Sequence, residues 1–153
     1  MLPRKSLILL FAALALLGAA RSEAQPLEIN LRGLSGVGLR TSDVASGNTI
    51  LVVWTSWSPR CRDIADRMST LSRQWGGKAK VYGVSFNEDA AEVERFLAGK
   101  SLSVPVLLDA DGSFSKKQAI TVLPGLVVIQ GGQVTYAGKL PDAPDGLLSG
   151  LLK

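Results

Sequence analysis

The chain has 153 residues, and 17 Lys and Arg residues against 13 Asp and Glu residues give a formal net charge of +4. This small excess of positive charge gives no basis for binding nucleic acid. The chain has no histidine and a single cysteine, Cys61, so His-based acid–base catalysis and an internal disulfide are excluded, and we expect neither a metal ion nor a cofactor.

The first residues have the pattern of an export signal. Arg4 and Lys5 precede an apolar run at 7–20, and small residues follow it. A helix over this run would span about 21 Å, which is short of a hydrocarbon core of about 30 Å. We therefore predict a signal peptide at 1–24 and one mature domain at 25–153, located in the periplasm or secreted. An uncleaved leader would instead tether the domain to the inner membrane.

Strand and helix patterns alternate along the first part of this domain. Alternating apolar residues predict a half-buried strand or hairpin from residue 27, and the β-branched run at 48–54 is typical of a strand covered on both faces. Helical spacing then predicts a helix at 61–75, followed by a buried strand at 80–86 and an amphipathic helix at 88–99. In this helix at 88–99, four acidic residues are expected on the solvated face: Glu88, Asp89, Glu92 and Glu94.

The second part of the domain continues with shorter elements. A strand is predicted at 104–109 and a brief helix at 114–119. The segment 125–138 reads as two strands joined by Gly131–Gly132, whose glycines supply the positive φ that a two-residue hairpin needs. A closing helix is predicted at 144–153. This order of elements predicts an α/β domain with a mixed central sheet and helices on both faces.

Three stretches carry a resemblance to a known family. They are WTSWSPRC at 54–61, VPVLLDADG at 104–112 and TVLPGLVVI at 121–129. The chain resembles the thioredoxin superfamily, specifically its exported TlpA-like and ResA-like thiol:disulfide proteins. In that family the first central strand ends in W-A-S-W-C-x-P-C, and a cis-proline later leads into a strand. The resemblance covers about residues 26–152 and implies a thioredoxin-like fold.

The resemblance also implies a surface that binds protein partners. Pro124 is expected to be cis, and the backbone of Leu123 would pair with an incoming peptide strand. Trp57 is expected to be exposed and to line the substrate groove, whereas Trp54 is expected to lie in the core. The implied partners are thiol-bearing or disulfide-bearing periplasmic proteins.

Ser58 occupies the position of the family's attacking cysteine. An alcohol is a poor nucleophile without a base, and no histidine is present to act as one. The internal dithiol cycle is therefore excluded. Ser58 followed by Pro59 has the pattern of a helix N-cap, so we expect its hydroxyl to accept the backbone amide of Cys61.

Cys61 leaves three hypotheses open. A helix N-terminus and the positive charges of Arg60 and Arg62 would lower the pKa of its thiol, and the protein would then act through one thiol or as a partner-binding helper in periplasmic redox or cofactor assembly. A buried, inert Cys61 would indicate a redox-inactive interaction module. The Ser58-x-x-Cys61 spacing also resembles the Thr-x-x-Cys of peroxiredoxins, although Trp54 stands where that pattern has proline, and it would indicate a one-cysteine peroxidase.

Overall fold

The computed structural model describes residues 26–153, so the predicted signal peptide at 1–24 lies outside the described residues. Over these described positions, no helix has the length and apolar character needed to span a membrane. The strands are β1 (Asn30–Gly33), β2 (Leu39–Arg40), β3 (Asn48–Trp54), β4 (Lys80–Phe86), β5 (Val106–Asp109), β6 (Gly125–Gln130) and β7 (Gln133–Lys139). The helices are α1 (Ile64–Trp75), α2 (Ala90–Leu97), α3 (Ser113–Lys117) and α4 (Asp145–Leu151), with 3₁₀ helices at Thr41–Val44 and Pro59–Cys61.

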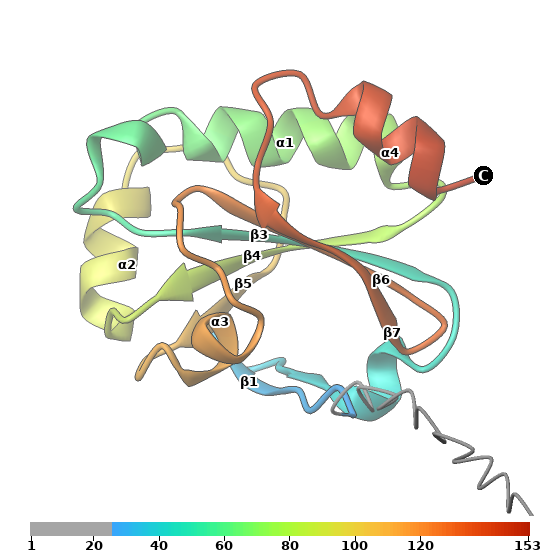
Figure 1. Cartoon of the computed structure of the whole chain (residues 1–153). Helices are drawn as coiled ribbons and strands as arrows, with labels where there is room; N and C mark the ends of the chain where they lie inside the picture. The colour runs from blue at the N-terminus through green and yellow to red at the C-terminus, as the bar shows by residue number, and fades with distance from the viewer. Residues whose placement is uncertain (1–25) are drawn as a thin grey trace, which may run out of the picture.

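The described strands form one mixed sheet in the order β2-β1-β5-β4-β3-β6-β7 (Figure 1). The central strands β3, β4 and β5 are parallel to one another. The hairpin of β6 and β7 adds to β3 in antiparallel orientation, and β1 pairs antiparallel with both β5 and β2. Parallel strands need crossover connections, and α1 and α2 supply them.

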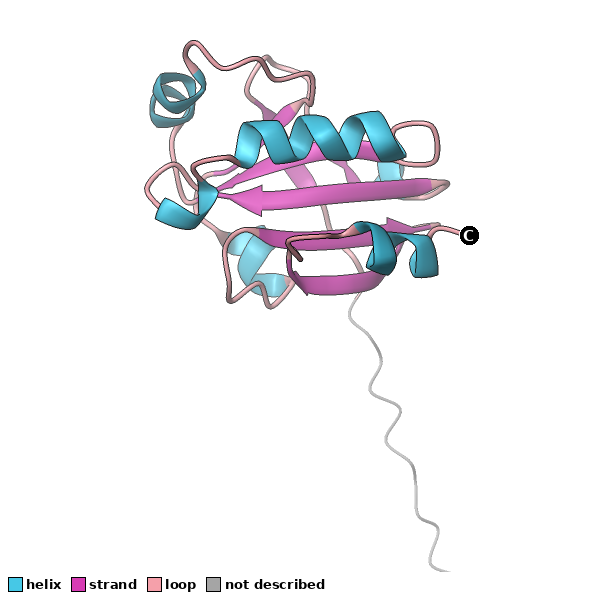
Figure 2. Cartoon of the chain, turned by 90° about the horizontal axis from the view of Figure 1, so that it is seen from above, coloured by secondary structure: helices cyan, strands magenta, loops and turns pink. Residues whose placement is uncertain are grey.

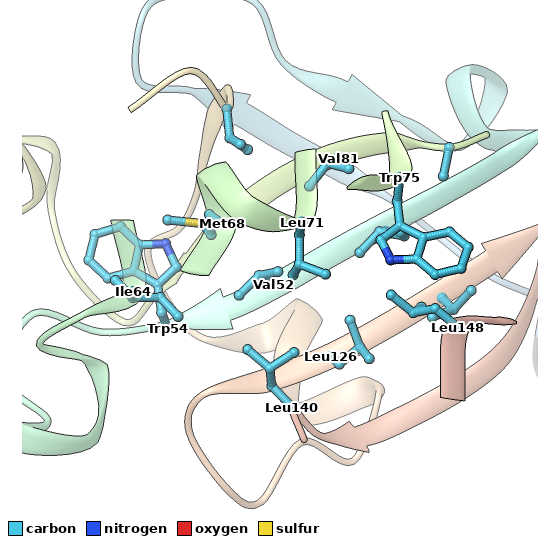
Figure 3. Close-up of a cluster of buried hydrophobic side chains, with 14 of the residues drawn as sticks. Val52, Trp54, Ile64, Met68, Leu71, Trp75, Val81, Leu126, Leu140 and Leu148 are labelled. Atoms are coloured by element: carbon cyan, nitrogen blue, oxygen red, sulfur yellow. The ribbon is translucent and has the colours of Figure 1, made fainter. Parts of the chain in front are cut away.

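Helices cover both faces of this sheet. Alternate residues of β3 point to opposite faces, so Val52 packs in the cluster that contains α1, α2 and α4, and Val53 packs in the cluster that contains β1 and α3. Figure 1 shows α1 and α4 above the strands and α3 below them, and Figure 2 shows the long α1 and the C-terminal helix lying over the strands. In the first cluster, Met68 and Leu71 of α1 lie over the end and the middle of β3 (Figure 3).

The predicted architecture of a mixed sheet with helices on both faces is confirmed, and one helix boundary is corrected. The helix predicted at 61–75 is divided into a 3₁₀ helix at Pro59–Cys61 and α1, which begins at Ile64. The break falls at Asp63, the N-cap of α1, whose ψ of 13° lies outside the helical range. The Gly131–Gly132 turn has the expected positive φ angles, 55° and 80°.

Candidate functional site at the end of strand β3

Two neighbouring segments flank the chain where it leaves β3. On one side, Val53 lies opposite Gly125 of the antiparallel β6, and Gly125 directly follows the Leu123–Pro124 pair. On the other side, Trp54 lies opposite Ser85 of the parallel β4. The loop that follows β3 therefore lies between the Leu123–Pro124 pair and the end of β4, and this arrangement brings the predicted site residues together.

The side chain of Cys61 is fully buried, with 0% of its surface exposed, and it belongs to the same core cluster as α1. Burial raises the pKa of the thiol above its ordinary value of 9.0, and the charge of Asp63 raises it further. Hydrogen bonds from the Thr55 backbone and the Ser58 side chain, and the charge of Arg67, act in the opposite direction but do not outweigh burial. Of the two environments that the sequence leaves open for Cys61, the structure shows the buried one, and the raised pKa does not support a thiol activated by the helix N-terminus.

The positive charges nearest to the thiol also differ from those expected. Arg60 and Arg62 are exposed, and the cationic side chain that acts on the thiol is Arg67 of α1. The guanidinium of Arg67 also donates a hydrogen bond of 2.7 Å to the Pro141 carbonyl, which fixes its position. The difference arises because Arg60 of the short 3₁₀ helix and Arg62, which directly follows that helix, are both turned toward solvent.

Ser58 does not cap the helix with its side chain, so that prediction is wrong. The amide of Cys61 donates instead to the backbone carbonyl of Ser58, at 3.0 Å, as the i→i+3 geometry of a 3₁₀ helix requires. The side chain of Ser58 acts on Cys61 instead, since it lowers the pKa of the thiol against the larger effect of burial.

The residues predicted to bind a peptide differ in exposure. Trp57 is 64% exposed, which is unusual for a large apolar side chain. The Leu123–Pro124 peptide bond is cis, Pro124 is buried and Leu123 is half-buried. Within residues 26–153 the backbone of Leu123 makes no hydrogen bond, whereas the carbonyl of Pro124 accepts the amide of Leu140 at 3.0 Å. Trp54 is fully buried, as predicted.

Glu88 was predicted to lie on a solvated helix face, and the structure corrects this. Only 3% of its surface is exposed, because the residue precedes α2 and turns back toward the loop after β3. Its carboxylate accepts hydrogen bonds from the Ser56 amide and from the hydroxyls of Ser56 and Ser85. The sequence contained a signal for this position, since Asp89 and Glu92 form a capping box that starts the helix after Glu88.

The chemistry open to this arrangement is limited. Among residues 26–153 no cluster of three or more His, Cys, Asp or Glu side chains is placed to hold a metal ion. The one thiol present is enclosed, and the neighbouring hydroxyl of Ser58 has no histidine beside it. The exposed side chain of the loop after β3 is Trp57, and the half-buried Leu123 lies just before β6, the strand that pairs with β3 on one side of this loop. We call Trp57 and the backbone of Leu123 the Trp57 surface.

Solved structures show which fold the chain has. A secreted Mycobacterium tuberculosis disulfide oxidoreductase homologous to E. coli DsbE is 22% identical, with a TM-score of 0.64 over 82% of this chain and 94% of that chain. The exposed lipoprotein thioredoxin Etrx1 from Streptococcus pneumoniae strain TIGR4 is 20% identical, with a TM-score of 0.71 over 82% and 98%. StoA from Bacillus subtilis is 21% identical, with a TM-score of 0.67 over 81% and 96%. The chain has the thioredoxin-like fold, as predicted.

The sequence itself gives the family. The model of the AhpC/TSA family matches residues 22–137, which is most of the chain. The protein therefore belongs to the AhpC/TSA family, within the thioredoxin superfamily. Among curated proteins there is no significant sequence match.

Proposed function

We propose that this protein is an exported, TlpA-like member of the superfamily that binds other exported proteins at the Trp57 surface, as a helper in periplasmic redox or cofactor assembly. In this proposal Cys61 takes no part in thiol exchange while the protein is folded. The observation that carries the proposal is the contrast in exposure between Trp57, at 64%, and Cys61, at 0%.

The state of the thiol supports binding over exchange. The nucleophile in thiol–disulfide exchange is the thiolate, and attack requires access to the sulfur. Burial removes that access and raises the pKa of Cys61, so little thiolate forms near neutral pH. Ser58 supplies no second thiol to resolve a mixed disulfide.

The Trp57 surface has the features that an extended peptide needs. The backbone of Leu123, which makes no hydrogen bond within residues 26–153, offers a donor and an acceptor to a partner strand, and the exposed Trp57 offers apolar area. Tryptophan is enriched among the residues that dominate binding energy in protein interfaces. The partners proposed from the family resemblance are thiol-bearing or disulfide-bearing proteins.

Site-specific cross-linking in cells tests this proposal. A photoreactive phenylalanine analogue is placed at Trp57 and, as a matched control, at Val37, the 81% exposed residue in the turn between β1 and β2. We expect a discrete cross-linked partner from position 57 and none from position 37, and we expect it to persist in Cys61→Ala. A partner that disappears in Cys61→Ala would overturn binding without thiol chemistry.

Export is tested separately by cell fractionation. We propose, from the leader at 1–24, that the protein is found outside the cytoplasm, either released in the periplasm or tethered to the inner membrane. Recovery of the full-length protein in the cytoplasmic fraction would contradict export. Fractionation with and without detergent separates the released form from the tethered form.

A one-cysteine peroxidase is the second candidate, and the lowering effect of the Ser58 side chain on the pKa of Cys61 favours it. In such an enzyme the thiolate attacks one peroxide oxygen, the O–O bond breaks, and the products are a sulfenic acid and water or an alcohol. Peroxide consumption by the purified protein, lost in Cys61→Ser, would support this function. Consumption that survives in Cys61→Ser, or none in the wild type, would exclude it.

A further inference from the structure

The carboxylate of Glu88 links the loop after β3 to the end of β4. Its Oε1 and Oε2 atoms lie 2.9 and 3.1 Å from the amide nitrogen of Ser56, and Oε1 also accepts the Ser56 hydroxyl. Oε2 accepts the hydroxyl of Ser85 at 2.9 Å. Glu88 itself is 3% exposed, so these contacts are shielded from solvent.

Within residues 26–153, no cationic side chain forms an ion pair with this carboxylate. In the described part of the chain the one ion pair joins Lys117 to Glu28, in another region. A buried carboxylate is costly unless donors surround it, and here the donors come from Ser56 and Ser85 alone. The free energy of burying the Glu88 side chain therefore depends on keeping the loop in its observed place.

The two sides of this link differ in rigidity. Ser85 is fully buried in β4, directly opposite Trp54 of β3, so it is a fixed anchor. Ser56 is half-buried in the loop, next to the exposed Trp57 and five residues before the enclosed Cys61. A displacement of Ser56 would therefore move the loop that carries the exposed Trp57 and leads into the buried Cys61.

We propose that Glu88 is a positioning residue for the Trp57 surface, and that its hydrogen bonds to Ser56 hold Trp57 in place and keep Cys61 closed from solvent. As far as it concerns partner binding, this inference rests on the proposed function. The closure over Cys61 does not depend on that function, and it can be measured on the protein alone.

The competing interpretation is that Glu88 only stabilises the fold. Asp109 provides the matched control, since it is 2% exposed and also accepts backbone amides and a serine hydroxyl, from Phe114 and Ser115. None of its partners lies in the loop after β3. Changing either carboxylate to the corresponding amide exchanges one buried acceptor oxygen for a donor, but only Glu88 is joined to the loop after β3.

The test measures the rate at which an uncharged maleimide alkylates Cys61 in the native full-length chain. In Glu88→Gln the new side-chain NH2 faces the amide and hydroxyl donors of Ser56 and Ser85, so the hydrogen bonds that hold the loop are weakened. We therefore expect Cys61 to be alkylated at least about tenfold faster than in the wild type. Asp109→Asn is expected to leave the rate within about twofold, after correction for the unfolded fraction measured in urea. Cys61→Ala gives the background.

Equal acceleration in both variants, in proportion to their loss of global stability, would overturn the proposal, and so would an unchanged rate in Glu88→Gln. Ser56→Ala removes one donor but keeps the amide, so it should accelerate alkylation less than Glu88→Gln does. Should Glu88→Gln fail to fold, an unchanged rate in Ser56→Ala would overturn the proposal by itself. Absence of a cross-linked partner at Trp57 would contradict the proposed function and leave the alkylation result unaffected.

Discussion

Two buried carboxylates, each at the end of one of two neighbouring parallel strands, bind different parts of the chain. Glu88 follows β4, and Asp109 ends β5, and the amide of Asn87 donates to the Asp109 carbonyl at 2.9 Å, so the two sites are adjacent. Both accept backbone amides and a serine hydroxyl. Asp109 closes the turn that starts α3, whereas Glu88 reaches a loop on the far side of β4.

The difference is one of distance along the chain. The partners of Asp109 are five and six residues away, so its bonds form as the local turn forms. The main partner of Glu88 is 32 residues away, so its bonds form only after β3 and β4 have paired. The hydrogen bonds of Asp109 therefore stabilise the turn before α3, whereas those of Glu88 can control where the loop after β3 lies.

The largest effect is expected for Asp109→Ala. This change leaves the amides of Phe114 and Ser115 and the hydroxyl of Ser115 buried without an acceptor, so we expect a loss of about 3–5 kcal/mol in the free energy of unfolding. Urea denaturation followed by circular dichroism measures it. The control is Asp111→Ala, an exposed residue of the same turn, which should lose much less. Similar losses would mean that the buried contacts contribute little.

Double-mutant cycles sharpen the comparison. The Glu88→Gln and Ser56→Ala pair, and the Asp109→Asn and Ser115→Ala pair, should each show a coupling free energy of about 1–2 kcal/mol, because each joins a carboxylate to a serine in a buried site. Unfolding midpoints of the single and double variants supply the values. A coupling near zero for the first pair would indicate that the loop does not depend on Glu88.

Much of the fold could be predicted because its signals are local. The bounds of β3 and β4 agree with the apolar runs at 48–54 and 80–86, since strands buried on both faces need continuous apolar sequence. The hairpin at Gly131–Gly132 is also a local feature, because two positive φ angles favour glycine. The start of α1 was not predicted, since apolar spacing does not distinguish a 3₁₀ turn from an α-helical one.

For the candidate site, the sequence predicted which residues take part but not the environment of each side chain. The resemblance identified Trp57, Leu123 and Pro124, but not the direction of the Cys61 pKa, which depends on how many core side chains surround the thiol. Glu88 was misplaced because its partner lies 32 residues away, and helical spacing carries no information about such a contact. Burial and long-range hydrogen bonds arise from the assembled sheet.

A pH titration of stability tests the closure that Glu88 is proposed to maintain. Burial raises the pKa of Cys61, so the folded protein keeps this proton where the unfolded chain releases it. The contribution of the protonated Cys61 thiol to the free energy of unfolding is complete below the ordinary thiol pKa of 9.0. It is lost as the pH rises toward the higher pKa that the thiol has in the folded protein. Between pH 9 and 10 we expect a loss of up to about 1.4 kcal/mol.

The control for this titration is Cys61→Ala, which should show a shallower decline over the same pH range. Tyr82, whose pKa is raised by burial and by Asp43, contributes above its ordinary value of 10.0 in both proteins, so it does not create the difference. Equal slopes would contradict a raised pKa for Cys61. In Glu88→Gln the slope should move toward that of Cys61→Ala, because an opened loop hydrates the thiol.

The smallest expected effect concerns Thr55, one residue before the Ser56 that Glu88 holds. Its hydroxyl is buried and has no hydrogen-bond partner within residues 26–153, whereas the amide and the hydroxyl of Ser56 both donate to Glu88. Thr55→Val keeps the shape and removes the unpaired group, so we expect stability to be unchanged or to rise by up to about 1 kcal/mol in thermal unfolding. A loss of similar size would mean that the hydroxyl is paired in solution, and the loop would then be held from two positions, with Glu88 only one of them.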